Sequence, residues 1–194
     1  MQWTGACRYV TFLRCAAPSQ VPAVKLTDQP PPRSTLPQSN MELQLAYDSN
    51  ATAEIAEASK LSNFRLFRVP VNAQTAPTDE LPAKWEQNSP RAASTFSAVC
   101  YLSALHFWRM RRDLPASHYV GLVWASLGST CIESWMDGPS LQRCGLPGAN
   151  LPSQAANTSS LFNGMIAPLI PFSFRSVWWY QGECSKQNYD AFYL

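Results

Sequence analysis

The chain has 194 residues, of which 46% are hydrophobic and 12% aromatic, and these values indicate a single globular domain with a buried core rather than a disordered chain. Its 15 basic and 13 acidic residues leave a formal net charge of +2 without a basic cluster interleaved with aromatic residues, so we expect no nucleic-acid partner. No apolar run is long enough to span a membrane, and residues 1–18 lack the continuous apolar centre of a convincing signal peptide.

Residues 1–36 show no apolar periodicity that predicts a helix or a strand. Proline recurs along this segment, and Gln29-Pro-Pro-Pro32 is an extended breaker of regular structure. The residues just before Gln38 also include prolines, which a central strand does not tolerate. We therefore expect an irregular N-terminal segment over residues 1–36, derived from a different exon or a mis-joined gene, and one folded domain over residues 37–194.

From residue 37 onward, short apolar runs alternate with helical patterns. Runs of β-branched and aromatic residues favour strands, and apolar residues three or four apart favour helices. These patterns predict strands near 64–69, 119–125 and 176–180 and helices near 41–48, 92–110 and 160–167, and residues 52–61 have a helix-forming composition. Such an alternation is typical of a three-layer α/β fold with a mostly parallel sheet.

Three polar motifs lie beside these predicted elements. Pro37-Gln-Ser-Asn-Met41 precedes the first helix, Ser126-Leu-Gly-Ser-Thr130 follows strand 119–125, and Gln181-Gly-Glu183 follows strand 176–180. Open α/β sheets bind ligands at the carboxyl ends of their strands, so the motifs are candidates for one site. By themselves, however, a Ser-Asn pair favours a helix cap, and a polar turn after a strand is explained as readily by solvation.

In this order and spacing, the three motifs resemble those of the sialate O-acetylesterase family of SGNH-type serine hydrolases. That family carries Gly-Gln-Ser-Asn-Met at its nucleophile, Ser-Ser-Trp-Gly-Gly-Thr at an oxyanion loop and Trp-Tyr-Gln-Gly-Glu-Ser-Asn after a later strand. The resemblance extends over residues 38–193 and includes Ile132-Glu-Ser-Trp135, where the family has Ile-Glu-Ala-Trp. It also includes Leu161-Phe-Asn-Gly-Met-Ile-Ala-Pro168, where the family has Leu-Trp-Asn-Ala-Met-Ile-His-Pro. It implies an SGNH (flavodoxin-like) hydrolase fold, of which residues 37–194 form a partial esterase domain.

The resemblance implies a role for four residues of this chain. Ser39 would be the nucleophile that attacks the acetyl ester. Its own backbone N–H, the N–H of Gly128 and the side-chain amide of Gln181 would form the oxyanion hole. Glu183 would orient the loop rather than transfer a proton. The substrate would be an O-acetylated sialic acid or another acetylated carbohydrate, hydrolysed without a metal or cofactor.

Three positions depart from the family's motifs. Pro37 replaces the glycine before the nucleophile motif, and because proline fixes φ and has no N–H, we expect a different turn there. Ser129 replaces the second glycine of the oxyanion loop, where we expect strain. Cys184-Ser185 replaces Ser-Asn, so contacts made by that asparagine do not carry over.

The family's catalytic histidine comes from an Asp-x-x-His-like block downstream, and these 194 residues contain no such block. Their two histidines are His106, which we interpret as a buried or boundary residue of helix 92–110, and His118. Loss of one member of a catalytic triad costs roughly 10⁴–10⁶ in rate. We therefore expect the C-terminal part of the fold to be missing and the chain alone to be inactive or nearly so. The alternative to an esterase is a truncated fragment or a non-catalytic pseudoenzyme.

The resemblance implies a lysosomal or secreted glycoprotein, and two features of the sequence agree with such a compartment. Asn50-Ala-Thr52 and Asn157-Thr-Ser159 fit the N-glycosylation pattern, which matters only in a secretory compartment. The six cysteines form no Cys-x-x-Cys pair, which argues against a zinc ribbon or a redox motif. In an oxidising compartment, Cys131 and Cys144 could close a short disulfide loop.

Overall fold

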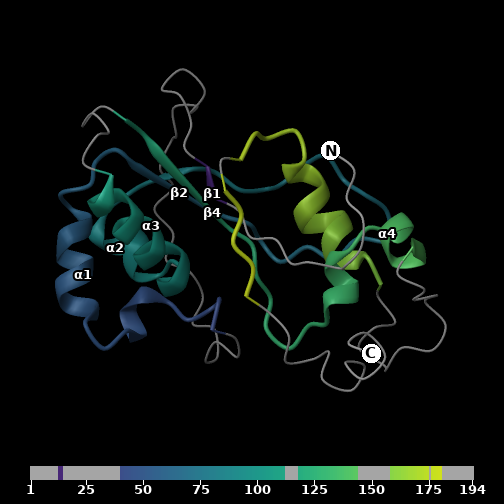
Figure 1. Cartoon of the computed structure of the whole chain (residues 1–194), viewed down its shortest axis with the longest axis horizontal. Coiled ribbons are helices and arrows are strands. Elements are labelled where there is room, and N and C mark those ends of the chain that lie inside the picture. Colours follow the sequence, from purple (N-terminus) through teal and green to yellow (C-terminus); the bar gives the residue numbers. More distant parts are fainter. Residues whose placement is uncertain (1–12, 15–39, 112–117, 144–157, 175, 181–194) are drawn as a thin grey trace.

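The computed structural model describes residues 13–14, 40–111, 118–143, 158–174 and 176–180 (Figure 1). The strands are β1 (Leu13–Arg14), β2 (Phe64–Arg68), β3 (Glu86–Gln87) and β4 (Val120–Trp124). The α-helices are α1 (Ala51–Ala58), α2 (Pro90–Ser94), α3 (Ala98–Met110) and α4 (Gly138–Arg143). Short 3₁₀ helices are η2 (Leu45–Tyr47), η3 (Ile132–Trp135) and η6 (Ala167–Leu169), and η5 (Phe162–Ile166) is a π-helix.

The sheet has the order β1-β4-β2-β3 and is partly parallel. Its central pair, β2 and β4, is parallel, with Phe64 opposite Val120 and Arg68 opposite Trp124. The two-residue edge strands β1 and β3 are antiparallel to their neighbours, so the prediction of a mostly parallel sheet holds for the central pair only. The predicted strands 64–69 and 119–125 are confirmed. β4 is buried throughout, and β2 buries Phe64, Leu66 and Phe67, as a sheet covered on both faces requires, and leaves its last residue exposed.

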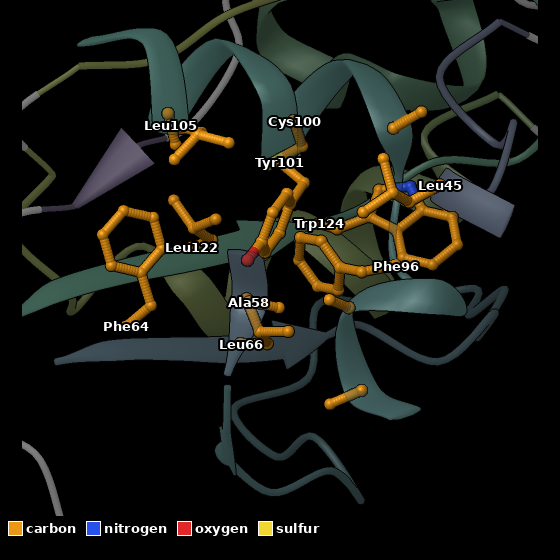
Figure 2. Packing of buried hydrophobic residues seen from close by; sticks show 14 of the residues in the cluster. Leu45, Ala58, Phe64, Leu66, Phe96, Cys100, Tyr101, Leu105, Leu122 and Trp124 are labelled. Carbon is orange, nitrogen blue, oxygen red and sulfur yellow. The ribbon is translucent and has the colours of Figure 1, made fainter. Parts of the chain in front are cut away.

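Hydrophobic side chains of the two central strands alternate between the two faces of the sheet. On one face, Phe64 and Leu122 belong to the first core, beneath α1, α2 and α3, and Figure 2 shows Tyr101 at the centre of it. On the other face, Phe67 and Val123 belong to the second core, beneath η3, η5 and η6. Figure 1 shows the same arrangement, with α1–α3 on one side of the strands and α4 on the other. The sheet is therefore covered on both faces.

The members of the two cores are as follows. The first core comprises Leu45, Ala58, Phe64, Leu66, Ala92, Ala93, Phe96, Ala98, Cys100, Tyr101, Ala104, Leu105, Val120, Leu122 and Trp124. The second core comprises Phe67, Val69, Trp85, Val123, Trp135, Leu161, Met165 and Leu169.

The predicted helix 92–110 is in fact two helices, α2 and α3. The Ser89 side chain accepts a hydrogen bond from Ala92 N and caps α2, and the Ser97 side chain accepts one from Cys100 N and caps α3. Between the two helices the chain pairs with residues 43–45, because Leu45 N donates to Phe96 O at 2.9 Å and Ala98 N donates to Leu43 O at 2.7 Å. The same pairing explains why the predicted helix 41–48 is wrong: only the single turn η2 forms there.

The two later predictions had different outcomes. A helix does form near 160–167, although it is the π-helix η5 continued by η6. The predicted strand 176–180 is wrong, because Ser176 makes an isolated bridge and residues 177–180 belong to no strand. Trp178 packs against the first core and Trp179 against the second, so this segment alternates like a strand without a ladder of its own. Within the described residues, no helix is long and apolar enough to cross a membrane.

A long connection, residues 72–78, lies along η5. Gln74 N donates to Ser160 O, and Thr78 N donates to Asn163 O, each at 3.0 Å. The Asn163 side chain completes the contact, because its Nδ2 donates to Gln74 O at 3.1 Å. Asn163 is therefore a buried polar residue whose amide joins this connection to the helix.

Candidate functional site

Three segments that are far apart in the sequence meet at one place. Asn40 Nδ2 donates a hydrogen bond to the hydroxyl of Tyr180 at 3.0 Å, across 140 residues. Gly128 N donates to Glu42 Oε2 at 2.8 Å, across 86 residues. The segment that begins at residue 40 therefore contacts both the loop after β4 and the segment 176–180. The first two carry polar motifs of the sequence, and the third directly precedes Gln181-Gly-Glu183, which lies outside the described residues.

The first of these segments is fixed by the backbone of α3. Its residues 43–45 pair with residues 96–98, and Leu45 is fully buried in the first core. Because one end of the segment is anchored in this way, Asn40 and Glu42 lie at the start of a rigid stretch. The rigidity limits how far their side chains can move from the partners described above.

The second segment is the loop over residues 125–130, which closes on itself through side-chain hydrogen bonds. Trp124 Nε1 donates to Ser126 Oγ at 2.6 Å, and Thr130 Oγ1 donates to Leu127 O at 2.6 Å. Trp135 Nε1 in turn donates to Thr130 Oγ1 at 2.9 Å. These bonds hold the loop at the carboxyl end of β4, the edge at which parallel sheets bind ligands.

Ser129 has a backbone conformation that glycine adopts easily and other residues adopt at a cost. Its φ is 59°, in the left-handed region that side chains with a Cβ disfavour. The sialate O-acetylesterase family has glycine here, so the strain expected from the sequence is present at this residue. A non-glycine residue in this conformation costs about 1–2 kcal/mol.

The N–H of Gly128, predicted as an oxyanion-hole donor, already has a hydrogen-bond acceptor. The carboxylate of Glu42, half-buried, takes the position that an anionic oxygen would occupy beside this N–H. The N–H can donate to a substrate oxyanion only if it exchanges one acceptor for the other. The oxyanion role of Gly128 therefore stays a prediction. Glu42 could not be identified from the sequence, because its contact with Gly128 depends on a fold that joins residues far apart.

The other predicted site residues, Ser39, Gln181 and Glu183, lie outside the described residues. Their sequence neighbours Asn40 and Tyr180, however, contact each other. Tyr180 is 54% exposed, so its ring is open to a ligand as well as to Asn40. The contact is consistent with a site that the first and third motifs share.

The two histidines of the chain lie on other segments than those that meet at this contact. His106 is exposed on α3, so the prediction of a buried or boundary side chain is wrong. His118 stacks on Trp108 with ring centroids 6.4 Å apart, and its carbonyl accepts a hydrogen bond from Asn63 Nδ2 at 2.7 Å. It precedes β4, whereas Gly128 follows β4, so the two residues lie at opposite ends of that strand.

The remaining predicted sites have mixed outcomes. Asn50 is exposed just before α1, whereas Asn157 lies outside the described residues, and glycosylation stays a prediction for both. Cys131 is disulfide-bonded to a cysteine outside the described residues, so pairing with Cys144 also stays a prediction. Cys100 is free, and burial raises the pKa of its thiol to about 12. Across the described part of the chain, no group of three or more His, Cys, Asp or Glu could hold a metal ion.

Comparisons with known proteins give the site a family context. The chain is 31% identical to the sialate O-acetylesterase of Homo sapiens over 167 residues and 28% identical to that of Rattus norvegicus over 193 residues. Each match covers 79% of the chain but only 31% and 34% of these relatives, so the chain spans about a third of their length. A carbohydrate acetylesterase from Xanthomonas citri superimposes with a TM-score of 0.62 and 34% identity, over 77% of the chain and 31% of that protein. No known protein-family profile matches the chain.

Proposed function

The chain is a distant homologue of the sialate O-acetylesterases and of a carbohydrate acetylesterase of known structure, and from this premise we propose that it carries the nucleophile side of a carbohydrate O-acetylesterase site. The observation that supports the proposal most directly is the meeting of three motif-bearing segments through Asn40–Tyr180 and Glu42–Gly128. Either hydrogen bond alone is explained as well by a role in stabilising the fold. Both together support a single site, because they join the loop after β4 to the residues that adjoin the proposed nucleophile and the third polar motif.

The proposed reaction is acyl transfer to the Ser39 hydroxyl. The hydroxyl oxygen attacks the acetyl carbonyl carbon, and its proton passes to a base. The carbonyl oxygen becomes an oxyanion, for which the N–H of Gly128 and the Gln181 amide are the proposed donors, with Glu183 orienting the loop. As this intermediate collapses, the carbon–oxygen bond to the sugar breaks, the base returns its proton to the sugar oxygen, and the sugar alcohol leaves acetyl-Ser39. Water, deprotonated by the same base, then attacks the acetyl carbon, which releases acetate and restores the Ser39 hydroxyl. Removal of one oxyanion donor typically lowers the rate by about 10²–10³.

The proposed substrate is an O-acetylated carbohydrate, and more narrowly an O-acetylated sialic acid. The similarity to the carbohydrate acetylesterase from Xanthomonas citri supports the broader class, and the similarity to the sialate O-acetylesterases supports the narrower one. A lysosomal or secreted location belongs to the same proposal and agrees with the disulfide at Cys131. A three-layer SGNH fold is proposed in the same way, supported by a sheet with a core on each face.

The base is the part of this site that the described residues do not provide. His106 and His118 lie away from the contact that joins the motifs, and a serine hydroxyl without a base is a poor nucleophile. We therefore expect the 194 residues alone to release little or no acetate. The alternative proposal, a non-catalytic binding protein, predicts that no added base restores activity.

Chemical rescue distinguishes these two proposals. The purified chain is incubated with an O-acetylated sialic acid and increasing imidazole, and acetate is measured against the Ser39→Ala variant. Imidazole should raise acetate release in the wild type above that in Ser39→Ala, because it supplies the missing base. A matched variant at an exposed serine, Ser62→Ala, should behave like the wild type.

Two results would contradict the proposal. Equal acetate release by the wild type and Ser39→Ala at every imidazole concentration would support the non-catalytic alternative. Turnover without imidazole that disappears in His106→Ala or His118→Ala would show that one of these histidines is the base.

A further inference from the structure

An exposed arginine lies at the same edge of the sheet as the candidate site. Arg68 is the last residue of β2, and its guanidinium carbon lies 4.5 Å from the centroid of the Trp124 ring. Arg68 takes part in neither of the ion pairs Lys60–Glu57 and Arg109–Glu54, and no acidic side chain of the described residues pairs with it. An exposed cation held on an indole face is ordered without being neutralised.

The pairing of β2 with β3 points to a second cation near this arginine. In the antiparallel pair of β2 and β3, Leu66 lies opposite Glu86, and the Phe67 and Trp85 rings continue the register with centroids 5.2 Å apart. Lys84 precedes Trp85 and β3, and if the register continues one residue further it would lie opposite Arg68; both side chains are exposed. Like charges opposite each other on one face of a sheet are destabilising.

The arginine is linked to the loop of the candidate site through the tryptophan beneath it. Trp124 is the last residue of β4, and its Nε1–H donates to Ser126 Oγ at 2.6 Å, within the loop that carries Gly128. Trp124 also packs edge-on against Phe96, which fixes its ring in the first core. The Arg68 guanidinium therefore lies over the packed Trp124 ring, which is hydrogen-bonded to the loop that follows β4.

We propose that Arg68, with Lys84 beside it, binds the carboxylate of an acidic sugar and makes the site prefer acidic over neutral acetylated carbohydrates. A guanidinium presents two parallel N–H donors to a carboxylate, which a neutral sugar cannot use. Stacking on Trp124 restricts the side chain before binding, so less rotamer freedom is lost when the carboxylate arrives. The inference rests on the proposed function, because it names the substrate class for that same site.

Equilibrium binding tests this inference without requiring turnover. N-acetylneuraminic acid and its uncharged methyl ester are titrated into the chain at low salt, and the indole N–H signal of Trp124 is followed by NMR. The wild type should bind the acid about tenfold more tightly than the ester, and the difference should shrink as salt is added. Arg68→Gln should abolish the difference, and Lys84→Gln should reduce it about twofold.

Arg65→Gln is the matched control. Arg65 lies on the same strand, and its guanidinium carbon lies 5.3 Å from the centroid of the Tyr119 ring, but it is near the opposite end of β2. This variant should keep the preference for the acid. If Arg65→Gln and Arg68→Gln reduce the preference for the acid over the ester equally, the inference is overturned. The preference would then depend on the net charge of the chain and not on the position of Arg68.

Two further outcomes separate this inference from the proposed function. If the wild type binds the acid and the ester equally, the inference fails, while a carbohydrate site remains. If neither sugar binds and imidazole rescue also fails, both proposals are wrong.

Discussion

Gly164 allows the connection over residues 72–78 to lie directly against η5, and its replacement by alanine should break that contact. A Cβ built on Gly164 would lie 1.8 Å from the backbone oxygen of Asn72 and 2.7 Å from its carbonyl carbon. Both atoms belong to the backbone, so no side-chain rotation relieves the clash. Asn72 must move by more than an ångström, and its Nδ2 then loses the hydrogen bond that it donates to Gly164 O at 3.3 Å.

The size of the effect follows from two opposing terms. Overpacking of this kind costs about 3 kcal/mol, and each hydrogen bond lost between the connection and η5 costs about 1 kcal/mol more. Alanine is favoured over glycine within a helix by about 1 kcal/mol. Gly164→Ala should therefore lower the free energy of unfolding by about 2–4 kcal/mol.

Urea unfolding, followed by tryptophan fluorescence, measures this change. Gly138→Ala is the matched control, because no atom lies within 4 Å of its added Cβ, and it should change the unfolding free energy by less than about 1 kcal/mol. If Gly164→Ala is as stable as Gly138→Ala, the connection does not lie on η5 in the way that the structure shows.

Three other predictions concern the loop after β4 and the first core. Ser129→Gly should be about 1 kcal/mol more stable than Ser129→Ala, because both remove the hydroxyl and only glycine relieves the positive φ; equal stabilities in urea would contradict this. Glu42→Ala should speed amide hydrogen exchange of Gly128, and Glu42→Gln, which keeps an acceptor oxygen, should restore much of the protection; unchanged exchange in both variants would mean that the bond does not hold the loop. Cys100 should resist iodoacetamide in the folded chain at pH 8, since a pKa of about 12 leaves about one thiolate in ten thousand, and it should react once urea unfolds the chain; rapid alkylation of the folded chain would contradict its burial.

The elements that could be predicted from the sequence are those that depend on the pattern of apolar residues within a short stretch of the chain. The runs 64–69 and 119–125 are apolar on both faces because both faces of β2 and β4 are covered, and that property is visible in the residues themselves. The two errors in helix prediction have one common cause. Residues 43–45 pair with residues 96–98, which shortens one helix and divides the other, and pairing across such a distance leaves no local pattern.

The candidate site shows the same division. Family motifs marked the three segments, and the glycine expected at Ser129 is explained by its positive φ. The contacts that join the segments could not be predicted, because a carboxylate such as Glu42 has no sequence pattern that marks it as the acceptor for a loop N–H. Arg68 was missed for a similar reason, since its stacking on Trp124 depends on the parallel register of two strands.

Acetylation of Ser39 tests the central claim most directly. The chain is incubated in imidazole, which supplies the base, with p-nitrophenyl acetate, whose leaving group departs without a proton donor, and the acetylated residue is identified by peptide mass spectrometry. We predict a single acetyl group on Ser39, with labelling suppressed by an O-acetylated sugar that competes for the site. Acetyl groups spread over lysines and other serines, at the same extent in Ser39→Ala, would contradict the account.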